Sequence, residues 1–513
     1  MSATYCRKFT YSLSPDSDLH ADILEMAQRA QNNRACLRFD VLHQTDSEHN
    51  HYQLYEVWAH RNAYDAFHQM PENHRIFEHI KLTANDSDSA QTTPLRVVSL
   101  NNNKSTAKPP FWDPYLWICF AMCVGVMGTA LVSPLYPLYQ ARWDLSAGDI
   151  TILYVVYMGS ALASLLFLGR LSDRKGYLLV LRLALSMVTL GIFLSAIAWN
   201  LSSFLFSRIL IGLASSMIVT AASLGLSKLN RTGDVQRAAA STTLMLALGF
   251  GLGPVVGGII AQWLPQPLVS SYIPSLILGV LAIYALYKIR VPSSTSTHSR
   301  PYSWRDYLPS IVLPSPGLRQ PFLLGCLSTC CAFSMFSLYA SLAPSFMANM
   351  VPWHGPVVSG FSIGIILFLS SGTQLLARRL HSKKCVMLGL AAFTVACLSL
   401  GLNIQSASAL LFICSVLMTS IGHGFCMLGG MSIVNKVAPS HLRAGMTSTY
   451  LIIGYLGAII PTLAIGWLAD LIGLNSALAW YCGTLALLTV VLGLIAWRTP
   501  LVPTHLLPGH QST

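Results

Sequence analysis

The stretch ALGFGLGPVVGGIIA, from Ala247 to Ala261, holds five glycines and a proline in a run without charge. Glycine and proline are the two poorest helix formers in water. Long apolar runs nevertheless form helices in lipid, where every backbone group must find a partner within the chain. Glycines spaced four apart, as at Gly249, Gly253 and Gly257, let a second helix approach backbone to backbone. The stretch therefore predicts a membrane helix that is tightly packed along one side.

The composition of the whole chain also predicts a membrane protein. Of 513 residues, 53% are hydrophobic and 10% are charged, and the mean hydropathy is +0.54. Soluble domains carry about 25% charged residues. No Glu follows Glu78, and the later part of the chain is strongly basic. We interpret this basic excess as loop charge that sets membrane orientation, so we expect no nucleic-acid partner.

Hydropathy after residue 110 predicts twelve apolar segments of about bilayer-spanning length. The predicted spans are 115–138, 149–170, 178–199, 201–225, 240–263, 271–289, 321–346, 356–377, 384–402, 407–434, 444–469 and 476–497. Lys and Arg concentrate in alternate loops, which the positive-inside rule places in the cytoplasm together with both termini. The first residues lack a signal-peptide core. We therefore expect an integral multi-pass protein of a bacterial inner (plasma) membrane.

The longest internal loop, 291–320, divides the twelve segments into two sets of six, at 115–290 and 321–498, followed by a tail at 499–513. Many transporters are built from two such halves. We expect a mainly α-helical membrane protein of two six-helix halves, preceded by a small α+β domain.

The first hundred residues predict that small domain. CRKFTYSLS, CLRFDVLHQ, HYQLYEVWA and PLRVVSL have the composition of strands, and helical segments follow the first and third of them. The order β-α-β-β-α-β is the ferredoxin-like arrangement. The domain is expected at 1–101, with a polar linker at 102–114.

CLRFDVLHQ followed by YQLYEVWAHRNAYDAF resembles the antibiotic biosynthesis monooxygenase (ABM) family, chiefly through Glu56 and Trp58. That family usually has a histidine where Phe67 stands, and His68 lies beside it. The catalytic residues therefore stay unassigned, with Glu56, Trp58 and His68 as pocket candidates. The resemblance implies dimers that pair through their sheets. It also implies a domain that modifies or senses an aromatic or quinone-like compound, in several members without a cofactor. The His and Cys spacings match no familiar metal site.

GRLSDRKG, at 169–176, lies between the second and third predicted spans. Its Gly169, Asp173, Arg174 and Gly176 match the G-x-x-x-D-R-x-G loop, and the sequence resembles the major facilitator superfamily in this motif. An Asp at a helix end can accept hydrogen bonds from the N-terminus of a neighbouring helix. We expect this loop to act as a conformational latch.

Arg208 and Gly212, four apart in the fourth span, resemble the R-x-x-x-G signature of the same superfamily. A guanidinium inside a span costs at least about 2.5–3.5 kcal/mol on insertion scales. Arg208 is therefore expected to face a cavity or a partner, with snorkelling to the interface as the alternative.

In the fifth span, Gly249, Gly253, Pro254, Gly257 and Gly258 reproduce G-x-x-x-G-P-x-x-G-G, the pattern of the drug/proton antiporter branches of the superfamily. Close packing and a proline bend predict a hinge that seals the two halves against ion leakage. Plain helix packing is the alternative interpretation.

Proton coupling has no obvious carboxylate, because all seven Asp after residue 110 lie at span ends or in loops. The mid-span candidate is His423, whose imidazole could carry a proton. Coupling through Asp173 and Arg208, and uncoupled transport, stay open.

The function expected from the sequence is proton-coupled efflux of a small apolar or aromatic compound, with the ABM-like domain as an accessory. The alternatives are a bifunctional protein whose ABM-like domain is an active monooxygenase, and an uptake permease.

Overall fold

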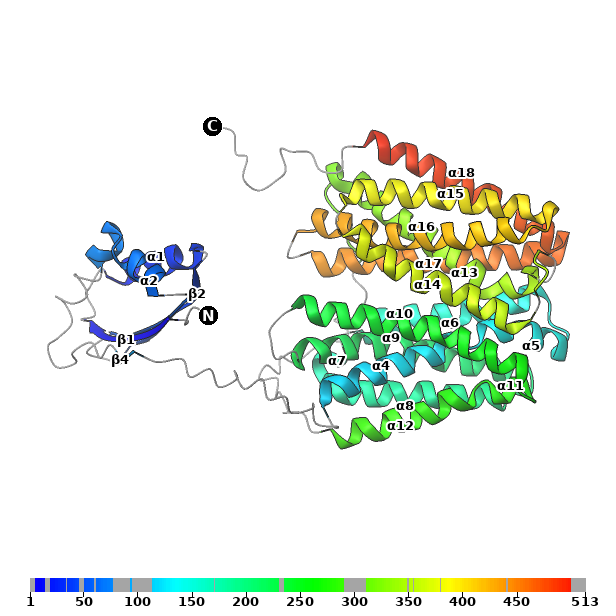
Figure 1. The fold of residues 1–513 in the computed structure, drawn as a ribbon, viewed down its shortest axis with the longest axis horizontal. Helices are drawn as coiled ribbons and strands as arrows, with labels where there is room; N and C mark the ends of the chain where they lie inside the picture. The colour runs from blue at the N-terminus through cyan, green and yellow to red at the C-terminus, as the bar shows by residue number, and fades with distance from the viewer. Residues whose placement is uncertain are drawn as a thin grey trace. The chain divides into compact units, whose positions relative to one another are not determined.

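A computed structural model describes residues 5–13, 19–33, 35–45, 50–59, 61–76, 93–94, 113–169, 171–229, 235–289, 311–347, 350–353, 355–378, 380–439 and 442–499. The chain divides into two compact units, Met1–Pro110 and Phe111–Thr513 (Figure 1).

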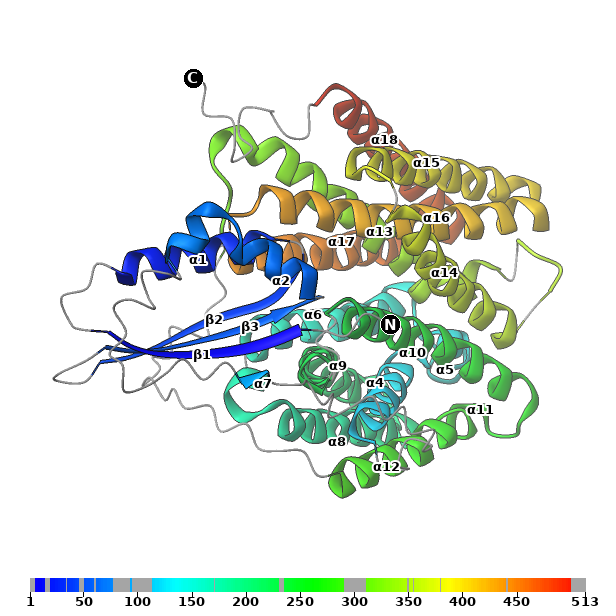
Figure 2. The same ribbon diagram turned by 60° about the vertical axis from the view of Figure 1, so that its left-hand side comes forward.

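The first unit is a four-stranded antiparallel sheet with helices on one face (Figure 2). The strand order is β2-β3-β1-β4. Its elements are β1 (Tyr5–Leu13), α1 (Leu19–Asn32), β2 (Cys36–Thr45), β3 (Asn50–Trp58), α2 (Arg61–His68), helical residues 71–76 and β4 (Thr93–Pro94). Ile23 and Met26 of α1 and Leu54 and Trp58 of β3 form the buried core with Phe67. The rest of the expected final strand and of the expected helix after residue 76 lies outside the described residues.

The second unit contains twelve helical segments long and apolar enough to cross a bilayer within the described residues, which confirms the prediction of twelve spans. The first half comprises α4 (Pro114–Ala130), η1 (Ser133–Leu135), α5 (Tyr136–Trp143), α6 (Ala147–Leu168), α7 (Leu171–Lys175), α8 (Tyr177–Ala196), α9 (Leu201–Leu229), α10 (Val235–Trp263), α11 (Pro267–Ser270) and α12 (Ile273–Lys288). The second half comprises η3 (Pro316–Leu318), α13 (Arg319–Met347), α14 (Pro356–Ala377), α15 (Ser382–Ser406), α16 (Ala409–Val437), α17 (Arg443–Ile472) and α18 (Leu474–Arg498).

The first span differs from the single helix expected at 115–138. It runs over Pro114–Trp143 in three pieces, α4, η1 and α5. Pro134 and Pro137 stand at the starts of η1 and α5, where a proline needs no intrahelical partner for its missing N–H group. The prolines therefore divide the span near its end.

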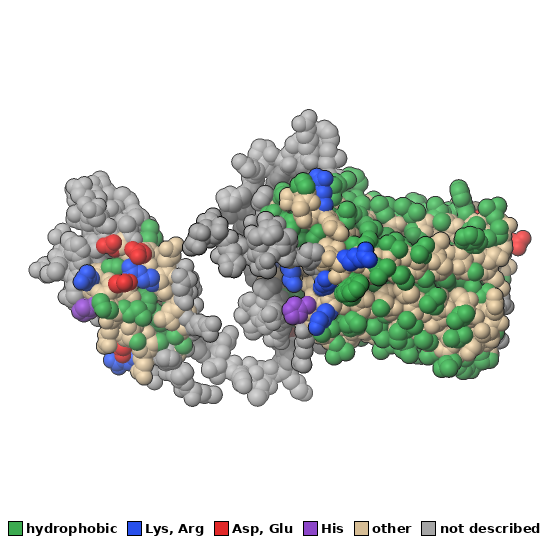
Figure 3. Space-filling view, turned by 90° about the horizontal axis from the view of Figure 1, so that it is seen from above, with side chains coloured by type: hydrophobic (Ala, Val, Ile, Leu, Met, Phe, Trp, Pro, Cys, Tyr) green, Lys and Arg blue, Asp and Glu red, His purple; other side chains and the backbone are tan. Residues whose placement is uncertain are grey.

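Two helix pairs join the halves side by side, α10 with α14 and α6 with α17 (Figures 1 and 2). Apolar side chains cover the side of the bundle seen in Figure 3, whereas the Lys and Arg side chains visible there gather at one end. We call this the basic end, and the opposite end the outer end, following the positive-inside rule.

Candidate functional site: the contacts between the halves

Helix α10 carries the glycine-proline pattern, and three of its glycines face α4 of the same half. A Cβ atom at Gly249 would lie 2.7 Å from the carbonyl oxygen of Cys123, and one at Gly257 would lie 2.6 Å from that of Leu131. A Cβ atom at Gly253 would touch the carbonyl oxygen of Met127. These three glycines therefore pack two helices of one half together. The i, i+4 and i+8 positions share one helix face, and α4 occupies that face, so the seal between the halves cannot be assigned to these three glycines.

The opposite face of α10 makes the contact between the halves. A Cβ atom at Gly258 would touch the carbonyl oxygen of Pro356 in α14, and one at Gly360 would touch that of Pro254. A Cβ atom added at Gly251 would lie 2.6 Å from the nearest ring carbons of Phe368 in α14. We call this contact the glycine seam: Gly251, Pro254 and Gly258 of α10, and Gly360 and Gly364 of α14. Of the motif residues, Pro254 and Gly258 therefore lie between the halves.

The second pair, α6 with α17, is held at the outer end by Asp470. Its carboxylate accepts hydrogen bonds from the Ser146 Oγ atom at 2.9 Å, the Ala147 N–H group at 3.0 Å and the Gly148 N–H group at 3.0 Å. The first N–H groups of a helix lack intrahelical partners and form its positive end. We call this contact the outer clasp: Asp470 with residues 146–148.

Sequence reasoning placed Asp470 at a span end and gave it no role. A signal was present at the other partner, because Ser146 and Asp149 form a capping box that marks the start of α6. A capping box does not, however, identify a partner 322 to 324 residues away in the chain.

The latch loop lies at the basic end, directly after α6. Gly169, the first residue of the loop, is the C-cap of α6, and Leu171–Lys175 form the short helix α7. Gly176 has a φ of +85°, a conformation that favours glycine. The side chains of Asp173 and Arg174 lie outside the described residues, so their latch role stays a prediction.

Arg208 is buried in α9, with 1% of its surface exposed. Its Nη2 atom is 3.5 Å from the Ser195 Oγ atom, and its guanidinium carbon is 5.4 Å from the centre of the Phe204 ring. Its Nε atom has no hydrogen-bond partner among the described residues. The side chain therefore faces the interior and does not snorkel. Gly212, on the same helix, lets α9 approach α6, since an added Cβ atom would be 2.5 Å from the Tyr157 carbonyl oxygen.

His423 of α16 contacts α13 and α14 within the second half. Its Nδ1 atom is 2.7 Å from the Ser370 Oγ atom, and its ring centre is 5.8 Å from that of Phe336. These partners can bind an uncharged imidazole, and none of them is a carboxylate.

Aromatic side chains meet where α6, α13 and α17 adjoin. The Tyr154 hydroxyl is 3.1 Å from the Ser337 Oγ atom of the other half, and the rings of Phe333 and Tyr455 are 5.3 Å apart. Tyr157 packs in the same cluster. The junction between the halves is thus aromatic and hydroxylated at mid-depth. The Asp residues in the described part of the second unit all lie at span ends or in loops.

In the first unit, the structure brings Glu56, Trp58 and His68 together. The Glu56 Oε2 atom accepts a hydrogen bond from the Trp58 Nε1 atom at 3.0 Å and lies 2.8 Å from the His68 Nε2 atom. Glu56 and Trp58 are fully buried, and the Glu56 Oε1 atom has no hydrogen-bond partner among the described residues. Phe67 stacks against Trp58 at 4.8 Å, so it fills the core where the ABM family usually has a histidine.

The family model described as Major Facilitator Superfamily matches residues 118–462, which include the glycine seam and most of the twelve spans. The chain belongs to the major facilitator superfamily. It is therefore an integral multi-pass membrane protein.

Similar curated proteins match only part of the chain. "Riboflavin transporter RibZ" of Clostridioides difficile is 26% identical over 174 residues, 34% of this chain and 38% of the relative. "Quinolone resistance protein NorA" of Staphylococcus aureus is 25% identical over 159 residues, 31% of this chain and 39% of the relative. The chain thus spans about two fifths of the length of these relatives.

Solved structures share the fold at low identity. A mutant of the nucleoside transporter NupG has a TM-score of 0.58 at 12% identity, covering 74% of this chain and 100% of that one. The POT family transporter PepTSo has a TM-score of 0.59 at 12% identity, covering 75% of this chain and 97% of that one.

Proposed function

We propose that this superfamily member exports small apolar or aromatic compounds across a bacterial inner membrane in exchange for protons, with both termini in the cytoplasm. The observation that carries the proposal is the G-x-x-x-G-P-x-x-G-G pattern of α10, whose Pro254 and Gly258 lie in the glycine seam. Glycine contacts let two backbones slide and separate without interlocked side chains. Such a contact suits a drug/proton antiporter, because its halves must part in every cycle.

The two helices of the outer clasp support a reciprocal mechanism. At the outer end, Asp470 near the end of α17 caps the start of α6. At the basic end, the latch loop with Asp173 follows the end of α6. Helix α17 begins at the same end. We infer that Asp173 caps the start of α17 when the basic end closes and the outer clasp opens. Each helix then supplies the acid that closes one end of the transporter.

The proposed substrate class rests on the side chains at the junction of the halves. At mid-depth, the junction of the halves carries Tyr154, Tyr157, Phe333 and Tyr455 and no acidic side chain among the described residues. Such a surface suits neutral or anionic aromatic compounds better than organic cations, which would require a carboxylate. The names of the relatives, with riboflavin and quinolone in them, agree with aromatic substrates.

The proposal is tested with Asp173→Asn in cells that lack the native gene. We expect the variant to reach the membrane and to lose nearly all efflux of the compounds that the parent removes. Asp144→Asn, outside the latch loop, serves as the control and should export normally. Normal efflux by Asp173→Asn would contradict the latch. Parent cells that clear none of a panel of neutral, anionic and cationic aromatic compounds would contradict export.

Coupling is assigned to His423, with Asp173 and Arg208 as the second route. His423→Gln keeps a hydrogen-bonding group beside Ser370 but cannot carry the proton. In inverted vesicles with a pH-sensitive dye, we expect it to bind substrate and to lose proton movement. Unchanged proton movement in His423→Gln together with loss in Arg208→Gln would move coupling to the second route. No substrate-driven proton movement in the parent would make transport uncoupled.

For the first unit, we propose a ferredoxin-like ABM domain that dimerises and modifies or senses the transported compound. The β2-β3-β1-β4 order and the Glu56, Trp58 and His68 cluster support it. The second candidate function, an active monooxygenase, is favoured by the Oε1 atom of buried Glu56, which has no hydrogen-bond partner in the described part of the chain. Oxidation of a quinol or anthrone by the full chain, lost in Glu56→Gln, would assign an enzyme. Absence of turnover would leave an accessory domain.

A further inference from the structure

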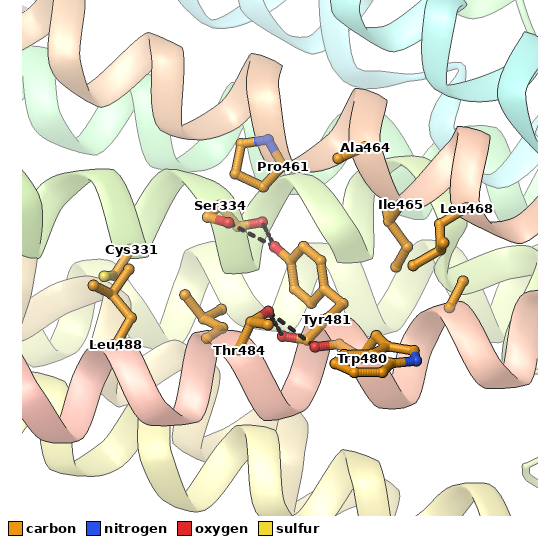
Figure 4. A pocket seen from close by; sticks show the side chains of 12 residues that line it. Cys331, Ser334, Pro461, Ala464, Ile465, Leu468, Trp480, Tyr481, Thr484 and Leu488 are labelled. Atoms are coloured by element: carbon orange, nitrogen blue, oxygen red, sulfur yellow. Dashed lines mark hydrogen bonds between the residues drawn. The ribbon is translucent and has the colours of Figure 1, made fainter.

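A groove of about 480 Å³ lies in the second half, between α13, α17 and α18 (Figure 4). It lies apart from the glycine seam and the outer clasp. Its lining residues are Cys331, Ser334, Pro461, Ala464, Ile465, Leu468, Ala477, Trp480, Tyr481, Thr484, Leu485 and Leu488. Trp480 is 65% exposed and Leu488 41% exposed, so the groove opens to the outside of the bundle, which faces hydrocarbon.

The polar groups on the groove wall already have partners. The Tyr481 hydroxyl donates to the Ser334 carbonyl oxygen at 2.8 Å and lies 2.7 Å from the Ser334 Oγ atom. The Thr484 hydroxyl donates to the Trp480 carbonyl oxygen at 2.9 Å. An occupant therefore gains nothing from polar groups, and the site suits a purely apolar chain.

The length of the groove along α18 matches the thickness of one leaflet of the hydrocarbon core. Its lining on α18 runs from Ala477 to Leu488, a rise of about 16 Å at about 1.5 Å per residue. Half of a hydrocarbon core of about 30 Å is about 15 Å. α18 starts at the outer end, and Trp480 lies near that start, where tryptophans favour the membrane interface. The groove thus begins below the outer headgroups and ends near the middle of the bilayer.

We propose that this groove binds one acyl chain of a phospholipid from the outer leaflet. The proposal rests on the predicted orientation and the spans, and it is independent of the exported compound. Ile465 and Leu468 of α17 line the groove, whereas Gly466 and Asp470 of the same helix contact α6. A bound chain therefore fills the space behind α17 and stabilises the outer-closed state.

The test uses the purified full chain, stripped of lipid in detergent, and the rise in Tm on adding dioleoylphosphatidylglycerol. Ala464→Phe fills the groove from an exposed position on α17, and Ala391→Phe makes the same change on the exposed side of α15 as a control. We expect the parent and Ala391→Phe to show the rise and Ala464→Phe to lose it. Leu468→Trp fills the groove from a second position and should behave like Ala464→Phe. The result then does not depend on one variant that folds poorly.

A rise that persists in both filled variants would overturn the site. An equal rise with dihexanoylphosphatidylglycerol, which has the same headgroup and short chains, would show headgroup binding and would overturn the acyl-chain assignment. Displacement of the lipid effect by an exported compound, in a parent that still transports it, would make the groove a substrate entrance and would overturn the proposal while leaving export intact.

Discussion

The glycine seam and the outer clasp join the same two halves by opposite means. In the glycine seam, α10 and α14 meet backbone to backbone, and the contact depends on absent side chains at Gly258 and Gly360. In the outer clasp, one charged side chain, Asp470, supplies the acceptors for three donors at the start of α6. A glycine contact is disrupted when a side chain is added, whereas a carboxylate contact is disrupted when the charged group is removed. The two contacts should therefore fail under different substitutions.

The largest effect is expected for Gly258→Leu, which places an isobutyl group against the Pro356 carbonyl oxygen. Overpacking destabilises the outer-closed state by about 1–3 kcal/mol. The equilibrium between the outer-closed and outer-open states therefore shifts by about 5- to 150-fold toward the outer-open state. Vesicle transport should fall accordingly while membrane insertion persists. Gly372→Leu on the same partner helix is the control, because nothing lies within 4 Å of its added Cβ atom. Parent-like transport by Gly258→Leu would remove the glycine seam from the mechanism.

Gly253→Leu separates packing within a half from contact between the halves. The added side chain clashes with the Met127 carbonyl oxygen of α4. We expect the overpacking to lower the free energy of unfolding by about 1–3 kcal/mol and therefore to lower the Tm. Gly258→Leu should change transport more than it changes Tm. If Gly253→Leu left Tm unchanged and altered only transport, the assignment of this glycine to the interior of one half would be wrong.

Asp470→Ala should open the outer end. Loss of the cap and of its charge at the helix start amounts to about 1.5–2 kcal/mol, a shift of about 10- to 30-fold toward outer-open molecules. Spin labels placed at the outer ends of α6 and α17 report the distance distribution. Asp149→Asn alters the capping of the same helix without touching α17, and it should leave the distribution in place. Equal shifts in both variants would make the effect one of helix capping alone.

Tyr154→Phe should have the smallest effect. It removes a hydroxyl that contacts Ser337 across the junction, a net loss of about 1 kcal/mol and a shift of about fivefold between states. Tyr339→Phe removes a comparable contact, to Ser415, within the second half and should not shift the states. A matching shift in both variants would assign the Tyr154 effect to general packing.

The sequence by itself determined the parts of this protein that depend on local chemistry. Twelve apolar segments and alternating loop charge specify a twelve-span bundle, because a bilayer accepts only helices of that length and polarity. The motif glycines of α10 specify close helix packing, because a residue without a side chain permits little else at that spacing. Glu56 and Trp58 were singled out by the resemblance to the ABM family, and they share a face of the sheet because they lie two apart on one strand.

Only the tertiary structure decided which helix meets which face. The motif on α10 contains glycines on both sides of the helix, and nothing in their spacing says that Gly253 meets α4 while Gly258 meets α14. Asp470 was unremarkable in sequence, since an acid at a span end is usually solvated, and its partner lies in the other half of the chain. Contacts between residues hundreds of positions apart are set by the packing of whole helices, which local patterns constrain but do not specify.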